Sequence, residues 1–113
     1  MWEWPASLDA LVAAPEFHSL VFENDDVRVL DTRIGPGATV PVHTHRWPSI
    51  LYMLCVEHHV RRDGEGTVLS DTRETGIPFE PGVAVPAAAM PPHTVENVGR
   101  SEIRMLNIEL KHG

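Results

Sequence analysis

Two histidines, His43 and His45, stand one residue apart in the stretch "TVPVHTHRWPSILYML", which covers residues 39–54. Alternate side chains of a β-strand face the same side, so these imidazoles would lie about 7 Å apart at their Cα atoms. That separation lets both rings reach one ion, and imidazole is a common ligand of zinc, iron, copper and nickel. A metal site is therefore the first chemistry that the sequence suggests.

The size and charge of the chain limit its possible functions. It has 113 residues, 42% of them hydrophobic and 22% charged, which fits one domain over residues 1–113. The net charge is −7, and no basic cluster exceeds the pair Arg61-Arg62, so we expect neither nucleic acid nor a membrane surface as a partner. No apolar stretch approaches the roughly 20 residues of a membrane span, and the N-terminus does not resemble a signal peptide.

The single cysteine, Cys55, suits a reducing compartment, so we expect a cytoplasmic protein. We also expect this side chain to act as a small buried hydrophobic group. Met53 and Met105 are candidates for a pocket lining. Ser49 and Trp47 are further candidates for that lining, although Trp47 could equally pack against its own turn or a dimer partner.

Short extended runs separated by turns make up most of the chain. The segment "SLDALVAAPEF" predicts a helix of about two turns, with Ser7 as its cap. After it, "HSLVFEN", "VRVLDTRI" and "SEIRMLNIEL" predict strands, and "DGEG" at residues 63–66 predicts a hairpin turn. The unbroken run "SILYMLCV" indicates a buried strand, and a proline-rich passage follows the hairpin. Regularly spaced short strands are typical of an all-β sandwich or barrel.

The setting of the histidines resembles two motifs of the cupin superfamily. Gly37, five residues and then His43 and His45 match the first motif, and "HTVEN" supplies His93 and Asn97 as in the second. The resemblance covers residues 27–110 and implies a double-stranded β-helix, or jelly-roll barrel, in which the three histidines converge on one metal. Residues 1–26 would then form an N-terminal helix and strand extension.

The chain departs from the cupin pattern at the fourth ligand. Where the first motif usually continues to a glutamate, this chain has Ser49, or Ile50 on the longer spacing. Neither Glu57 nor Glu96 reaches the same ion from a regular strand, whereas Glu80 stays open as a replacement. We therefore expect three histidine ligands, with water or substrate in the remaining positions. Fe²⁺ is the first expected ion, and Zn²⁺, Mn²⁺, Ni²⁺ and Cu²⁺ are alternatives.

The other histidines carry no such pattern. His58 and His59 are adjacent, so a strand sends them to opposite faces, and we interpret both as ordinary strand residues. His18 and His112 stand near the ends of the chain, and we expect both to be solvated. Arg46 could grip a carboxylate substrate, although an exposed surface position is the favoured interpretation.

Three neutral imidazoles leave the charge of a divalent ion uncompensated, so such a site should attract anionic, chelating ligands. We expect a dioxygenase-type metalloenzyme that acts on a small anionic substrate. The alternative is a non-catalytic cupin that binds or senses a small ligand, with or without metal. An isomerase or lyase ranks last, because no carboxylate base is evident. We also expect a homodimer in which Trp2 and Trp4 cover the edge of a partner's sheet.

Overall fold

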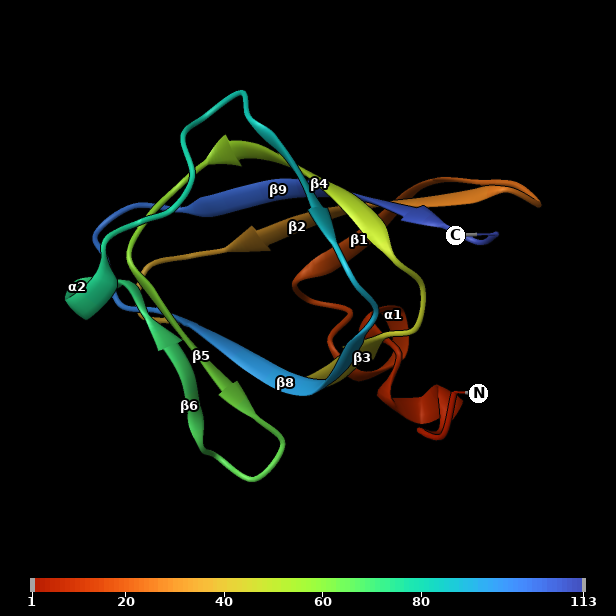
Figure 1. Ribbon diagram of the computed structural model, residues 1–113, viewed down its shortest axis with the longest axis horizontal. Helices are drawn as coiled ribbons and strands as arrows, with labels where there is room; N and C mark the ends of the chain where they lie inside the picture. Colours follow the sequence, from red (N-terminus) through yellow and green to blue (C-terminus); the bar gives the residue numbers. More distant parts are fainter. Residues whose placement is uncertain (1, 113) are drawn as a thin grey trace.

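Two β-sheets face each other across the interior of the computed structural model, which describes residues 2–112 (Figure 1). The first sheet has the strand order β1-β2-β9-β4-β7, and the second has the order β3-β8-β5-β6. The strands have the following bounds: β1 His18–Glu23, β2 Val27–Ile34, β3 Thr39–His45, β4 Ser49–Cys55, β5 His59–Asp63, β6 Val68–Asp71, β7 Ala84–Ala87, β8 Met90–Asn97 and β9 Ile103–Leu110. This is the expected all-β, double-stranded β-helix.

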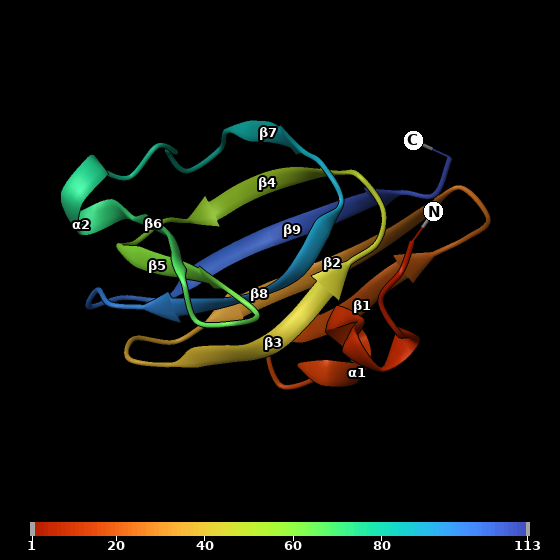
Figure 2. The same ribbon diagram turned by 60° about the horizontal axis from the view of Figure 1, so that its bottom comes forward.

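The N-terminal helix is shorter than the sequence predicts. It consists of a 3₁₀ turn, η1 (Ala6–Leu8), and a single α-helical turn, α1 (Ala10–Ala13). Asp9 rather than Ser7 caps α1, because its Oδ2 accepts a hydrogen bond from the Leu11 backbone N–H at 3.1 Å. Figure 2 shows α1 beside β3 and β1, so this short helix lies against both sheets.

β1 extends the first sheet by pairing with β2, from His18 opposite Thr32 to Glu23 opposite Arg28. β1 has no other partner strand within residues 2–112 and therefore forms an edge. A hydrophobic cluster of Ala14, Ile34, Val40 and Ile103 forms the buried core. No helix in residues 2–112 is long and apolar enough to cross a membrane.

The apolar run of β4 is buried on one face only, so the expectation of a wholly buried strand is wrong. Ser49, Leu51 and Met53 are buried, whereas Ile50 and Tyr52 are more than a third exposed. The alternation arises because β4 lies in a sheet whose outer face has no covering layer. The predicted burial of Cys55 is also wrong, since a register shift after Met53 leaves Cys55 exposed at the strand end.

The structure of the polar segments agrees more closely with the predictions from the sequence. The predicted hairpin turn joins β5 and β6, with the Asp63 N–H donating to the Thr67 carbonyl at 2.9 Å. A single helical turn, α2 (Thr72–Thr75), comes next and was not predicted. The proline-rich passage yields β7, a strand of four residues, and the start of β8. This passage forms one wall of the interior.

Candidate metal centre

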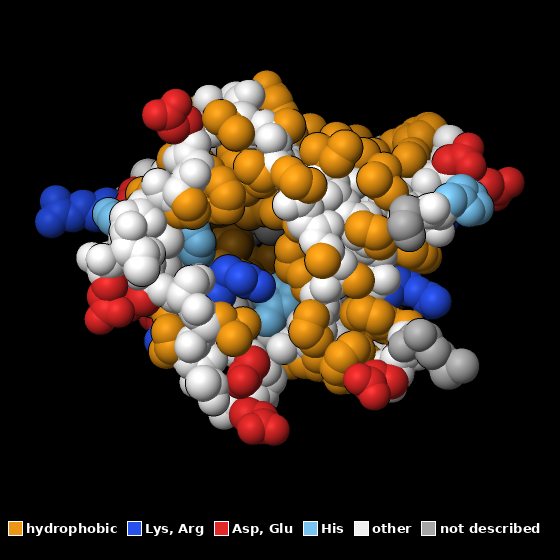
Figure 3. Space-filling model, viewed as in Figure 1, with side chains coloured by type: hydrophobic (Ala, Val, Ile, Leu, Met, Phe, Trp, Pro, Cys, Tyr) orange, Lys and Arg blue, Asp and Glu red, His pale blue; other side chains and the backbone are white. Residues whose placement is uncertain are grey.

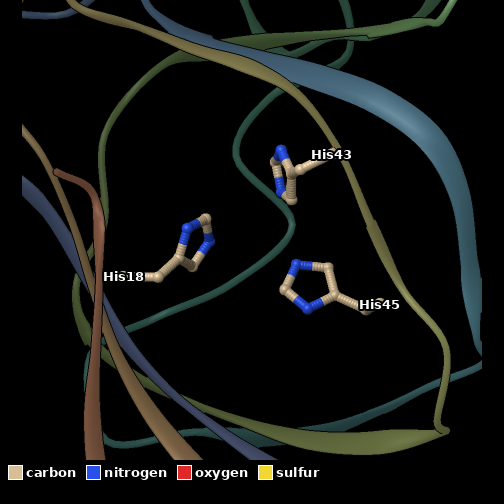
Figure 4. Close-up of side chains that lie close together, drawn as sticks. All are labelled: His18, His43 and His45. Atoms are coloured by element: carbon tan, nitrogen blue, oxygen red, sulfur yellow. The ribbon is translucent and has the colours of Figure 1, made fainter. Parts of the chain in front are cut away.

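Three histidine side chains point toward one another inside the barrel (Figure 4). His18 comes from β1, and His43 and His45 come from β3. One ligand nitrogen from each lies within 4.8 Å of the other two. Their ring centroids are 4.9 Å (His18 to His43), 5.5 Å (His18 to His45) and 5.0 Å (His43 to His45) apart.

His93 of β8 adds a fourth imidazole beside this group. It stands directly opposite His43 in the β3–β8 ladder, and their ring centroids are 4.3 Å apart. The His93 centroid is 5.7 Å from that of His45. The predicted residues His43, His45 and His93 therefore lie together, and His18, expected to be solvated, joins them with 4% of its surface exposed. The expectation for His18 is wrong.

Each of the four rings is held through its Nδ1 atom. Nδ1 of His43 lies 2.8 Å from the Pro41 carbonyl, and Nδ1 of His93 lies 2.8 Å from the Pro91 carbonyl. Nδ1 of His18 lies 3.0 Å from the carbonyl of Ala14, which ends α1. A carbonyl can only accept, so Nδ1 carries the proton in these three rings and Nε2 presents its lone pair.

His45 is held by a carboxylate instead. Its Nδ1 lies 3.0 Å from Oε2 of Glu109, a fully buried residue of β9. The other Glu109 oxygen accepts a hydrogen bond from Nε of Arg28, and the Arg28 Nη atoms donate to both oxygens of Asp9, the cap of α1. The helix cap, Arg28 and Glu109 thus form one chain of charged hydrogen bonds that ends on His45.

A buried carboxylate, that of Glu109, lies close to the position where the first motif usually has a glutamate. Ser49, which stands where a glutamate was expected, faces Glu109 across the β4–β9 ladder. The carboxylate therefore comes from the neighbouring strand and holds a histidine rather than standing among the ring nitrogens. Glu57 and Glu96 are engaged elsewhere: Glu57 accepts hydrogen bonds from the backbone of residues 58, 100 and 101, and Glu96 pairs with Arg62. Glu80 is exposed in the loop before β7.

Burial favours the neutral form of three of the clustered histidines, His18, His43 and His93. It lowers the pKa of His43 to about 2, with the nearby rings of His93 and His45 adding to the effect. It lowers the pKa of His18 and of His93 to about 4, against the hydrogen bonds from their rings to backbone carbonyls. Arg28 behaves differently, because its hydrogen bonds to Asp9 and Glu109 overcome burial and raise its pKa. Neutral imidazoles are the form that binds a metal ion.

The histidines line a cavity of about 440 Å³ between the sheets. Figure 3 shows it as a hollow with mainly hydrophobic walls and with histidine and basic side chains at its margin. Met53 and Met105 line it, whereas Ser49 and Trp47 are absent from its lining within residues 2–112. Ser49 is buried beside Glu109, and the Trp47 ring lies 5.1 Å from the guanidinium carbon of Arg28. Trp47 therefore packs against its own chain near the charged network.

The remaining histidines lie apart from the cluster. Nδ1 of His58 lies 3.0 Å from Oγ1 of Thr72, and His112 is exposed beside Asp26, as expected for a solvated residue. His59 lines the cavity, and its Nδ1 lies 3.0 Å from the Glu57 carbonyl.

The donor set of the cluster fits a transition-metal ion. Closely spaced neutral imidazoles with oriented rings are suitable ligands for ions such as Fe²⁺, Zn²⁺ and Cu²⁺. No hydrogen bond within residues 2–112 uses the Nε2 atoms of His18, His43, His45 or His93. The outer hydrogen bonds therefore fix the rings, and the ligand atoms remain available.

Comparison with solved structures identifies the fold. A cupin domain from Bordetella pertussis Tohama I matches with a TM-score of 0.67 and 22% identity, over 83% of this chain and 91% of that one. An RmlC-like cupin from Methanocaldococcus jannaschii matches with a TM-score of 0.59 and 9% identity, over 84% and 79% of the two chains. The polyketide cyclase RemF from Streptomyces resistomycificus matches with a TM-score of 0.55 and 19% identity, over 88% and 68%.

No family model matches the sequence, and no curated protein matches it. The likeness is therefore one of fold. This chain has the double-stranded β-helix of the cupins, and a group of histidines that could hold a metal ion lies inside it.

Proposed function

We propose that this protein is a metal-dependent, oxygenase-type enzyme that acts on a small anionic substrate in the cavity. The cluster of buried histidines supports the proposal most strongly. Ligand atoms of His18, His43 and His45 lie within 4.8 Å of one another, and the His93 ring lies against that of His43. A bound divalent ion such as Fe²⁺ would supply a Lewis acid and, being redox-active, electrons for a reaction with dioxygen.

The residues around the cluster favour an anionic substrate. Burial favours the neutral form of His18, His43 and His93, and the nearest carboxylate, Glu109, is already paired with Arg28 and His45. The positive charge of an ion held there would thus be only partly compensated, and the surrounding apolar walls strengthen its attraction for an anionic group. The same walls reduce access of water to the reacting atoms.

Metal analysis and oxygen consumption test the proposal together. Protein purified without chelators should contain stoichiometric transition metal. After anaerobic loading with Fe²⁺ it should consume oxygen with at least one member of a panel of thiols, diketones and phenols. Retained iron without oxygen uptake across that panel would contradict the oxygenase function.

The apolar lining also supports a second candidate. RemF, named as a polyketide cyclase, shares the fold, and a cavity of about 440 Å³ admits a ring system as well as a small acid. A cyclase would convert its substrate in the absence of oxygen, which distinguishes it from the oxygenase. A non-catalytic, ligand-binding cupin remains the alternative, and it would retain ligand without converting it.

We also propose a cytoplasmic homodimer, although not one built by Trp2 and Trp4 alone. These two rings pack against each other edge to face, with centroids 5.0 Å apart. Leu20, Val21 and Phe22 of the edge strand β1 are each at least half exposed. An apolar edge strand is a favourable surface for pairing with a second copy. The single cysteine suits the reducing cytoplasm.

A further inference from the structure

Two adjacent arginines of β5 lie on opposite faces of the second sheet. Arg62 forms an ion pair with Glu96, with 2.9 Å between Nη1 and Oε1, and about a third of each side chain is exposed (32% and 33%). Arg61 instead lines the cavity, as His59 does two residues earlier. Such alternation is expected along a strand. Arg61 is the single lysine or arginine in the cavity lining within residues 2–112.

The guanidinium of Arg61 has no partner of its own. No hydrogen bond or ion pair within residues 2–112 involves it, although six other arginines and lysines form seven ion pairs there. Glu57, the one acidic residue that lines the cavity within residues 2–112, directs its carboxylate to the backbone N–H groups of residues 58, 100 and 101. Arg61 is half-buried, and burial alone lowers its pKa. An arginine nevertheless keeps its charge, so this cation lacks a counter-charge among the residues that the structure describes.

Strand register places Arg61 close to the histidine cluster. Arg61 pairs with Val95 of β8, and His93 lies two residues earlier on the same strand, opposite Asp63. Such diagonal neighbours on one face of an antiparallel pair are about 7–8 Å apart. His93, Val95 and Arg61 all line the cavity. One small molecule can therefore contact the guanidinium and the histidine cluster at the same time.

We propose that Arg61 binds the carboxylate of an apolar acid whose second polar group lies at the histidine cluster. The contact at the histidine cluster rests on the function proposed above, whereas the contact with Arg61 does not. A guanidinium binds a carboxylate through two parallel hydrogen bonds, and the apolar walls strengthen that interaction. Phe79, Val85 and Met105 line the cavity and offer contacts to an aromatic or branched aliphatic body. The substrate class is thus that of apolar monocarboxylic acids.

Isothermal titration with 3-phenylpropanoate and the matched 3-phenylpropanamide tests this inference. The acid and the amide share size and shape, so their affinity ratio isolates the charge. We expect the acid to bind about tenfold more tightly than the amide, as one charge-assisted contact would give. The ratio should fall to near unity in Arg61→Gln and partly recover in Arg61→Lys. It should be unchanged in Arg62→Gln, which removes the neighbouring charge on the outer face.

The inference is overturned if the unmodified protein binds neither probe, if it binds both equally, or if Arg62→Gln lowers the ratio as much as Arg61→Gln does. Arg61→Lys keeps the test decisive if the glutamine variant does not fold. Titrations of metal-free and metal-loaded protein separate this inference from the proposed function. A protein that retains metal but shows no preference for the acid contradicts the role of Arg61 alone. A protein that shows an Arg61-dependent preference but retains no metal contradicts the metal-dependent function alone.

Discussion

The cavity has two walls that differ in how firmly they are held. In the histidine wall (His18, His43, His45 and His93) each Nδ1 atom is hydrogen-bonded to backbone or to Glu109, and each residue is at most 4% exposed. In the proline-rich wall (residues 77–91), β7 has four residues and pairs with no strand of residues 2–112 except β4, and every residue is exposed or half-exposed. We therefore expect the first wall to hold a metal ion and the second to contact the apolar part of a ligand.

Removing the central ring of the histidine wall should have the largest effect. The His43 ring lies 4.9, 5.0 and 4.3 Å from those of His18, His45 and His93. We expect His43→Ala to reduce bound metal from stoichiometric to trace amounts, measured by elemental analysis after purification without chelators. His112→Ala, which removes an exposed histidine, should leave the metal content unchanged. Equal metal content in the two variants would show that the cluster does not hold the ion.

Glu109→Gln should weaken metal binding by the histidine wall, because Glu109 holds the His45 ring in place. The change removes the charge that holds His45 and Arg28, so metal affinity should fall by about 10- to 100-fold. Leaving Arg28 with Asp9 as its one remaining charged partner should also reduce the free energy of unfolding, by up to about 3–5 kcal/mol.

Glu96→Gln is the matched control for Glu109→Gln, because Glu96 forms a partly exposed ion pair with Arg62. It should change stability by at most about 1 kcal/mol and leave metal affinity unchanged. Metal competition with a chromogenic chelator and urea unfolding measure the two effects. Equal losses of metal affinity and stability in the two variants would show that Glu109 has no special role.

The histidine wall should also make the stability of the metal-free protein depend on pH. Burial lowers the folded-state pKa of His18 and His93 to about 4 and that of His43 to about 2, all below the ordinary value of 6.5. As the pH falls from 6.5 towards 4, the unfolded chain binds protons that the folded chain does not. The free energy of unfolding should therefore decrease over this range, by about 1.4 kcal/mol for each unit of pKa difference at most.

Urea unfolding at a series of pH values measures this loss. His18→Phe removes one of the titrating groups, so its stability should fall less steeply over the same range than that of the unmodified protein. A pH-independent stability between pH 6.5 and 4 would contradict the burial of neutral rings.

The histidine pair and the all-β class could be predicted because both depend on local spacing, and the double-stranded β-helix was implied by the resemblance to the cupin motifs. Alternation along a strand places His43 and His45 on one face, and the second motif supplies His93 on the strand that pairs with β3. His18 could not be predicted in this way. It reaches the cluster because α1 ends at Ala14 and β1 then pairs with β2, and no sequence spacing encodes those tertiary contacts.

The spacing along β9 does carry a signal for Glu109. Ile103, Met105 and Asn107 line the cavity, and Glu109 follows them at the same two-residue interval along β9. An acidic residue on the inner face of an apolar strand needs a buried partner, which indicates a functional or structural ion pair. In β4 the sequence misled instead, because an unbroken apolar run does not reveal that Ile50 and Tyr52 face outward.

Ala87→Leu should test the proline-rich wall with a smaller effect. Ala87 lines the cavity, whereas Ala84 of the same strand is exposed and does not line it. A leucine at position 87 takes up cavity volume, so affinity for 3-phenylpropanoate should fall several-fold while metal content stays constant. Ala84→Leu should alter neither quantity. Loss of metal in Ala87→Leu would show that the two walls are not independent.

The smallest effect on the site is expected from a substitution at Phe22, which lies on the edge strand β1, four residues after His18. Phe22 is 52% exposed on this edge strand, and a lysine there adds charge to an apolar surface that a second copy would cover. Phe22→Lys should therefore convert a dimer into a monomer in light scattering, with metal content and ligand affinity unchanged. Val68→Lys is the control, because Val68 is 53% exposed on β6 in the other sheet. A monomer before any substitution would contradict the dimer, and loss of metal on dissociation would show that β1 needs a partner to hold His18 in place.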